Sequence, residues 1–236
     1  MPSEIILTIR KELEKNADSA TRESGIHFFK EEVHLYGVKS ALVGKIAAQH
    51  FKSIKNLAKS EIFSLCAELF QSDMMEESFI ACDWAYALRA QFEAADFSVF
   101  EGWVNTYIHN WAACDTLCNH TLGSFIEMYP QFLANLKGWT QSPNRWVRRA
   151  SAVTLILPAR KGLFLADVFA ISDALLLDGD DLVQKGYGWA LKEASRMHQA
   201  QVFNYILKHK ALMPRTALRY AIEKMPPELR TRAIQK

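Results

Sequence analysis

The sequence lacks the features of a membrane or secreted protein. Half of its 236 residues are hydrophobic, yet no run of 18 apolar residues occurs. The longest apolar stretch, "ASAVTLILPA" at 150–159, is too short to cross a bilayer and ends near Pro158. The N-terminus carries Glu4 and has no basic region followed by an apolar one, so it does not resemble a signal peptide. We therefore expect a cytoplasmic protein with no membrane partner.

Cysteine is scarce, which argues against a disulfide framework and a structural zinc site. The chain has four cysteines, too few to form a disulfide framework in a chain of this length. Cys114, Cys118 and His120 lie close in sequence, but no second ligand pair stands at a usual zinc spacing. Cys114 and Cys118 are four residues apart on an apolar helical face, which favours buried free thiols. We expect no metal and no cofactor.

Glycine is also scarce, and the common catalytic motifs are missing. The ten glycines form no phosphate-binding loop, and neither G-x-S-x-G nor H-E-x-x-H occurs. The seven histidines are scattered without ligand spacing. A nucleotide-binding loop, a serine hydrolase and a zinc peptidase are therefore not indicated.

Charge is unevenly distributed although the net charge is only +2. Residues 1–136 contain 11 Lys and Arg against 18 Asp and Glu, a net charge of −7. Residues 137–236 contain 17 against 8, a net charge of +9. The split suggests a polyanionic partner for the C-terminal half. It is equally compatible with a long helical protein that distributes solvated charges unevenly.

Hydrophobic periodicity predicts helices along nearly the whole chain. In "SEIFSLCAELFQ" at 60–71, apolar residues recur at the three-and-four spacing of a helix with one buried face. Similar patterns predict further helices at 4–14, 21–34, 39–52, 76–94, 97–108, 111–128, 130–140, 145–157, 161–177, 181–196, 199–209 and 214–224. No run of alternating apolar and polar residues bounded by the turn residues of a hairpin appears, so we expect no strands.

Many helices with short connections predict stacked antiparallel helix pairs. Such pairs form either a bundle or an α-solenoid of degenerate HEAT-like repeats. The length allows one elongated domain or two small ones, and because no linker or low-complexity segment interrupts the chain, we expect a single domain over 1–236. Within it, we expect Asn144 or Ser142, and Asp180, to cap helices.

The stretch "NWAACDTLC" at 110–118 places a carboxylate one helical turn after an indole. On a helical wheel, Trp111, Asp115 and Asn119 form a stripe along the edge of a face. That apolar face consists of Cys114, Leu117, Cys118, Thr121 and Phe125. An edge stripe lines a groove between helices, so the tip of Asp115 can be solvated while Trp111 forms the wall beside it.

A second helix combines an indole with positive charge. In "QKGYGWALKEASR", Lys185, Trp189, Lys192 and Arg196 lie on one stripe, opposite Tyr187 and Leu191. Cations beside an exposed ring suit a nucleic acid, because the cations can contact phosphates while the ring packs on a sugar or base. The alternative is an interhelical tryptophan anchor with solvated lysines beside it.

A third helix begins with an arginine cluster in "SPNRWVRRAS". Arg145, Arg148 and Arg149 lie within about a third of a turn near the helix start, where guanidinium groups and free amides both favour phosphate. Trp146 points the other way and is expected in the core. The alternative is that the arginines bridge acidic residues of the N-terminal half.

With these three helices, the chain resembles the AlkD family of DNA alkylation repair glycosylases, which are HEAT-like α-solenoids. The resemblance covers nearly the whole chain and includes "FFKEEVHLYGVKS", "NWAACD", "NRWVRRAS" and "VQKGYGWALKE", in that order. It places Trp111, Asp115, Arg149 and Trp189 at the family's functional positions, with Arg148 as the alternative to Arg149. The chain has Ala112 where family members often carry a second acid, and Phe28 where they carry a tyrosine.

The resemblance implies an enzyme that removes N3- or N7-alkylated purines from double-stranded DNA without capturing the base in a deep pocket. It implies an α-solenoid whose concave basic face binds DNA, with Asp115, Trp111 and Trp189 as catalytic residues. Contacts to phosphates are expected from Arg145, Arg148, Arg149, Lys185, Lys192 and Arg196. We expect a monomer. The competing interpretation is a non-catalytic scaffold that binds nucleic acid or an acidic protein.

Overall fold

A computed structural model describes residues 3–235, and in that range the regular elements are all helices, with no β-strand. One isolated bridge pairs the backbones of His34 and Met74. The chain divides into two compact units, Met1–Thr116 and Leu117–Lys236. The expectation of a single domain over the whole chain stays a prediction.

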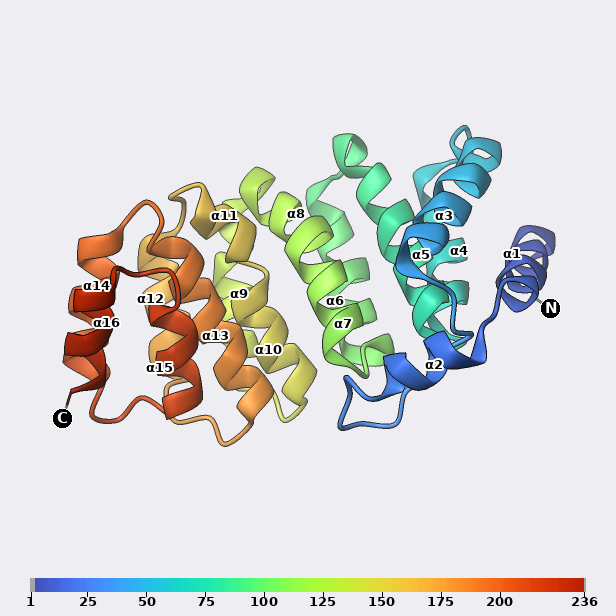
Figure 1. Ribbon diagram of the computed structural model, residues 1–236. Helices are drawn as coiled ribbons and strands as arrows, with labels where there is room; N and C mark the ends of the chain where they lie inside the picture. Colours follow the sequence, from blue (N-terminus) through green and yellow to red (C-terminus); the bar gives the residue numbers. More distant parts are fainter. Residues whose placement is uncertain (1–2, 236) are drawn as a thin grey trace. The chain divides into compact units, whose positions relative to one another are not determined.

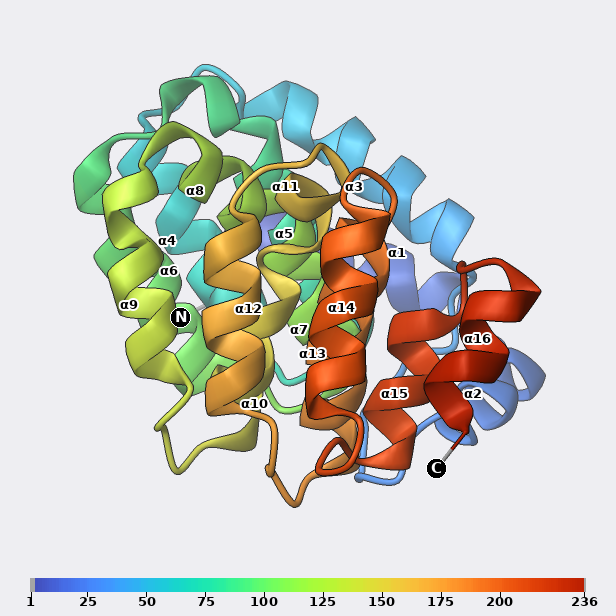
Figure 2. The same cartoon turned by 90° about the vertical axis from the view of Figure 1, so that its left-hand side faces the viewer.

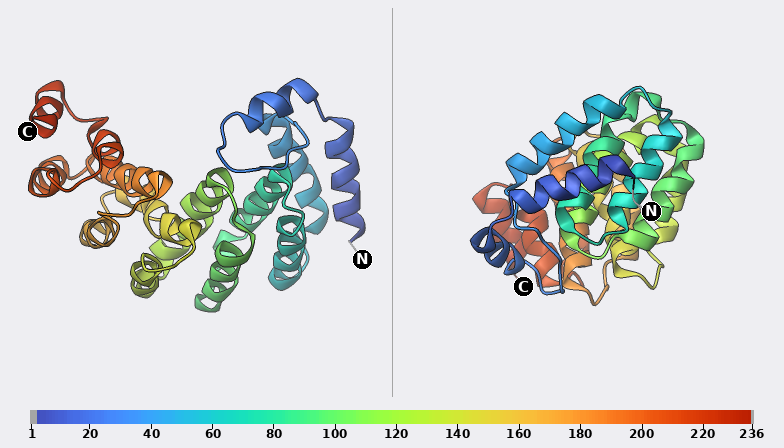
Figure 3. Two further views of the ribbon diagram at one scale, coloured as in Figure 1. Left: turned by 90° about the horizontal axis from the view of Figure 1, so that it is seen from below. Right: turned by 90° about the vertical axis from the view of Figure 1, so that its right-hand side faces the viewer.

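The first unit contains seven α-helices, shown in blue to green in Figure 1. They are α1 (Glu4–Lys15), α2 (Ser19–Ile26), α3 (Ser40–Ile54), α4 (Lys59–Phe70), α5 (Met75–Ala87), α6 (Phe97–Tyr107) and α7 (Trp111–Thr116). The helix α5 packs against both α3 and α4, an arrangement that can be followed in Figure 3. Trp84 anchors this packing, because its buried indole Nε1 donates a hydrogen bond to the Ala47 carbonyl at 2.9 Å.

The second unit begins with a π-helical turn at Leu117–Leu122 and continues through nine α-helices. They are α8 (Gly123–Met128), α9 (Leu133–Trp139), α10 (Arg145–Val153), α11 (Ile156–Arg160), α12 (Leu165–Ala174), α13 (Asp181–Ala194), α14 (Gln199–His209), α15 (Arg215–Ile222) and α16 (Pro227–Ile234). The helix α13 is central to this unit and packs against α10, α11, α12 and α15 (Figure 2). Consecutive helices joined by short turns lie side by side in both units, which confirms the predicted class of stacked helix pairs.

Several predicted helices are shorter in the structure, among them those at 21–34, 76–94 and 145–157. The pattern at 21–34 predicted a helix, but α2 ends at Ile26 and residues 27–39 form a loop. The helix predicted at 145–157 ends at Val153, and α11 follows from Ile156. Pro158 explains the second break, because it has no amide hydrogen for the carbonyl of Thr154 and its ring would clash with that carbonyl in a continuous helix.

The predicted caps and thiols are confirmed. The side chain of Asn144 accepts a hydrogen bond from the Trp146 amide at 2.9 Å, and Asp180 accepts one from the Leu182 amide at 2.8 Å. All four cysteines are buried and free. Burial raises the pKa of the Cys82 thiol well above its ordinary value, which keeps that thiol protonated and unreactive.

Candidate functional site

The helix α7 presents an indole and a carboxylate at its edge, as the sequence predicts. Its first turn is capped by Asn110, whose side-chain Oδ1 accepts a hydrogen bond from the Ala113 amide at 2.8 Å. Trp111 and Asp115 are partly exposed, whereas Ala113 between them is buried. The same helix therefore packs inward through small side chains such as Ala113 and leaves Trp111 and Asp115 partly exposed.

The predicted stripe does not continue beyond Asp115. The chain enters a π-helical turn at Leu117, in which hydrogen bonds span five residues, so the spacing of an α-helical wheel no longer applies. Asn119, expected at the edge, is buried with 8 % of its surface exposed. The face formed by Cys114, Leu117 and the residues after them is buried as expected.

A loop of the first unit forms a wall around Trp111. The ring of Phe29 stacks on the indole with centroids 5.1 Å apart and an interplanar angle of 19°. The indole Nε1 donates a long hydrogen bond, 3.4 Å, to the carbonyl of Phe28, a residue that is itself 73 % exposed. The three rings border a largely apolar cavity of about 280 Å³ that also reaches Leu35 and Phe79. Residues 28–29 were predicted to be helical, but they lie in the loop and form part of this wall.

The loop is held by a buried glutamate that sequence reasoning missed. Glu76, only 3 % exposed, accepts hydrogen bonds from the amides of Tyr36 at 3.1 Å, Gly37 at 2.8 Å and Val38 at 3.0 Å. Gly37 has φ of +91°, and a Cβ there would lie 2.3 Å from the Asp18 carbonyl, so only glycine fits. A glutamate at the start of a helix is common, and nothing in the sequence signals its partners about 40 residues away.

The next residue, Glu77, ties the same loop to α1. It is completely buried, and the Arg10 guanidinium donates three hydrogen bonds to it, two to Oε2 at 3.0 and 3.1 Å and one to Oε1 at 3.1 Å. The hydroxyl of Tyr36 also donates to Oε1, at 2.7 Å. Burial and this bond to a carboxylate raise the pKa of Tyr36. Glu76 and Glu77 together determine where the loop that covers Trp111 lies.

In the second unit, the arginines at the start of α10 have protein partners. Arg145 Nε lies 2.7 Å from Asp180, and Arg148 Nε lies 2.7 Å from Asp178. Arg145 and Arg148 therefore do bridge acidic residues, as the alternative interpretation expected. The acids belong to the turn before α13, however, and not to the N-terminal half. Trp146 is buried as predicted.

Arg149 differs from its neighbours because its side chain is buried. Only 4 % of the residue is exposed, and its guanidinium donates a short hydrogen bond to the backbone carbonyl of Leu182. Gly186 packs beside this side chain, and a Cβ there would be in ordinary van der Waals contact with Arg149 Cγ at 3.5 Å. Burial favours Arg148, whose side chain is 21 % exposed, over Arg149 as a contact for an external phosphate.

The helix α13 presents Trp189 at the surface, with cations around it. Tyr187 and Leu191 are completely buried, whereas Trp189 is partly exposed, as the stripe predicted. Gly188 allows α15 to approach closely, because a Cβ there would lie 2.7 Å from the Ala217 carbonyl. This tight crossing fixes how closely α13 and α15 pack.

Each predicted cation of this stripe is paired with a carboxylate. Lys185 binds Asp181 at 3.1 Å, Lys192 binds Glu223 at 3.0 Å, and Arg196 binds Glu193 at 2.6 Å. Lys192 Nζ also lies 5.7 Å from the centroid of the Trp189 ring, within cation–π range. Glu193 is a further buried acid that sequence reasoning missed.

The two halves of the predicted site belong to different units. Trp111 and Asp115 lie in the first unit, and Arg149 and Trp189 lie in the second. Their convergence on one surface stays a prediction. Among residues 3–235, no three potential ligands lie close enough to hold a metal ion. None of the helices in that range is both long and apolar enough to span a membrane.

Comparisons with known proteins define the class. A solved structure described as a predicted DNA alkylation repair enzyme from Enterococcus faecalis matches with a TM-score of 0.80 at 15 % identity, covering 90 % of this chain and 98 % of that one. No curated protein matches significantly. The fold is therefore that of a helical-repeat protein of the α-solenoid type. Residues 9–225 match the family described as DNA alkylation repair enzyme, and the chain belongs to that family.

Proposed function

We propose that the protein is a DNA glycosylase that hydrolyses the N-glycosidic bond of cationic N3- or N7-alkylated purines in duplex DNA. The observation that carries this proposal is the pair on α7, a partly exposed carboxylate one turn after a partly exposed indole. Membership of a DNA alkylation repair family supports the substrate class.

The chemistry suits a single carboxylate. An alkylated purine of this kind carries positive charge, so it leaves without prior protonation, whereas ordinary glycoside hydrolysis uses two carboxyl groups. As the bond from C1′ to the base nitrogen breaks, its electron pair neutralises the base and C1′ becomes oxocarbenium-like. Asp115 would stabilise this charge and orient the water whose oxygen bonds to C1′. The proton lost by that water passes to Asp115 or to solvent.

The two exposed indoles would flank the reacting sugar. Their ring faces favour a cation and exclude bulk water. Catalysis would occur on the open surface, without a deep pocket for an extruded base. The cations of α10 and α13 would bind phosphates by exchanging a carboxylate partner for the DNA backbone, and binding would therefore be salt-dependent.

Release of free base from defined DNA tests the proposal. Duplex DNA with one 7-methylguanine is incubated with the protein, and released base is measured by chromatography. We expect release with the wild type and almost none with Asp115→Asn. Salt-dependent DNA binding without base release by the wild type would instead support a non-catalytic scaffold that binds nucleic acid.

A further inference from the structure

A buried glutamate on α13 binds two arginines at once. Glu193 is 2 % exposed, and its Oε2 lies 2.8 Å from Arg160 Nε and 2.6 Å from Arg196 Nε. The two arginine side chains are 47 % and 44 % exposed, so their outer faces are in solvent. One carboxylate between two guanidiniums leaves a net charge of about +1 at this surface.

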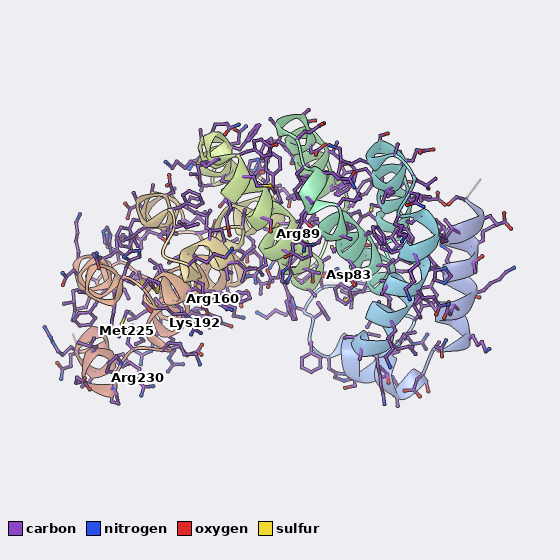
Figure 4. All side chains as sticks on the ribbon, turned by 90° about the horizontal axis from the view of Figure 1, so that it is seen from above. Asp83, Arg89, Arg160, Lys192, Met225 and Arg230 are labelled. Atoms are coloured by element: carbon purple, nitrogen blue, oxygen red, sulfur yellow. The ribbon has the colours of Figure 1, made fainter. Side chains whose placement is uncertain are left out.

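The other oxygen of the same carboxylate contacts the indole of the proposed site. Trp189 Nε1 donates a long hydrogen bond, 3.4 Å, to Glu193 Oε1. The two residues are four apart on α13 and therefore project on the same side of the helix. Lys192, whose ammonium lies within cation–π range of the indole, lies on the same side of the unit as Arg160 in Figure 4.

Stability alone does not account for this arrangement. Burying a carboxylate costs desolvation free energy, and apolar replacements of buried ion pairs are often neutral or stabilising. A purely structural ion pair would also require neither a second arginine nor an indole. Glu193 links three side chains that all reach solvent on one face of the unit.

We propose that Glu193 is a positioning residue, which orients the Trp189 indole and holds Arg160 and Arg196 as a paired cation for a DNA phosphate. The proposal rests on the proposed function and deepens it. The hydrogen bond from Trp189 Nε1 to Glu193 directs one edge of the indole inward, so that the ring face is presented to the substrate. Arg160 then joins the phosphate contacts, although the sequence analysis did not single it out.

The first test measures the indole directly and does not depend on catalysis. In ¹⁵N-labelled protein, the Trp189 indole N–H resonance is assigned by its loss in Trp189→Phe. We expect Glu193→Gln to shift this resonance and to accelerate its hydrogen exchange. Glu77→Gln is the matched control, since Glu77 is also completely buried and binds Arg10. A Trp189 resonance that Glu193→Gln leaves unmoved would overturn the proposal.

The second test asks whether Glu193 acts through Trp189 during excision. Single-turnover release of 7-methylguanine is measured with saturating protein for wild type, Glu193→Gln, Trp189→Phe and the double variant. Each single variant should be slower by about 10-fold, and the double variant no slower than Trp189→Phe, because coupled residues are not additive. If the rate losses of the two single variants multiply in the double variant, as they do for independent residues, Glu193 does not act through Trp189 and the proposal is refuted.

Further variants keep the outcomes distinguishable. Glu193→Asp keeps the charge and shortens the side chain by one methylene, so it carries both tests if Glu193→Gln does not fold. For excision the control is Asp96→Asn, because Asp96 is a buried acid that binds Lys59 at 2.8 Å outside the proposed site; it should leave the excision rate of folded protein unchanged. A wild type that releases no base would refute the proposed function, and the indole resonance would then decide by itself whether Glu193 positions Trp189.

Discussion

Replacing Asp115 by asparagine removes one negative charge from the edge of α7 and keeps the size of the side chain. A unit charge about 4 Å from an oxocarbenium centre is worth about 4 kcal/mol at an effective dielectric constant of about 20. Asp115 is partly exposed, and screening lowers this value somewhat. A loss of about 3–4 kcal/mol of transition-state stabilisation corresponds to about 10²–10³ in rate.

The assay is single-turnover excision of 7-methylguanine from duplex DNA, with thermal unfolding and binding to undamaged duplex measured in parallel. Asp83→Asn is the matched control, because Asp83 (labelled in Figure 4) is an exposed residue on α5. It lines a cavity together with Thr116, the residue after Asp115. Asp83→Asn should change excision by no more than a few-fold. Asp115→Asn should bind undamaged DNA as well as wild type or slightly better, since a negative charge that faces phosphates is lost.

Two results would refute this reasoning. Wild-type excision by Asp115→Asn would remove the carboxylate from the mechanism. A loss of melting temperature, with excision reduced only in proportion to the unfolded fraction, would show that Asp115 has a structural role instead.

Four further predictions follow from particular contacts. Gly188→Ala should lower the free energy of unfolding by about 1–3 kcal/mol in a denaturant titration, because its Cβ would collide with α15. Glu76→Ala should cost at least roughly 2–3 kcal/mol, since it leaves three loop amides without their acceptor; an unchanged melting temperature would contradict this. Burial raises the pKa of Glu193, but its two arginine partners outweigh this and lower the pKa below the ordinary value for a glutamate, so its stabilisation is complete above the unfolded-state pKa and is lost as pH falls through the folded one. In urea titrations, the difference in stability between wild type and Glu193→Gln should therefore shrink as pH falls below the ordinary glutamate pKa of about 4.3. Lys185→Ala should weaken binding to unrelated duplexes equally and reduce the salt slope by about 1, and affinity that is insensitive to salt between about 50 and 200 mM would contradict a basic DNA-binding surface.

Local features of the candidate site were predictable because they depend on short-range periodicity. The four-residue spacing of Trp111 and Asp115 places both on one side of a helix, whatever the rest of the chain does. The same holds for Trp189 on α13, opposite the buried Tyr187. Burial of Trp146 followed from the same periodicity.

The helical class, the caps at Asn144 and Asp180 and the buried thiols were likewise predictable from the sequence, because periodicity, capping and burial of small apolar side chains act within one or two turns.

The partners of the buried charges could not be predicted from the sequence. Glu76 reaches a loop about 40 residues away, and Glu193 binds Arg160 across α11 and α13. Long-range pairs depend on which helices pack together, and no local pattern encodes that choice. Tertiary packing also ended the predicted helix at Ile26, because the amides at the end of loop 27–39, those of Tyr36, Gly37 and Val38, bind Glu76 on α5. Folding thus decides which charges face solvent, and with that which of the predicted cations can reach DNA.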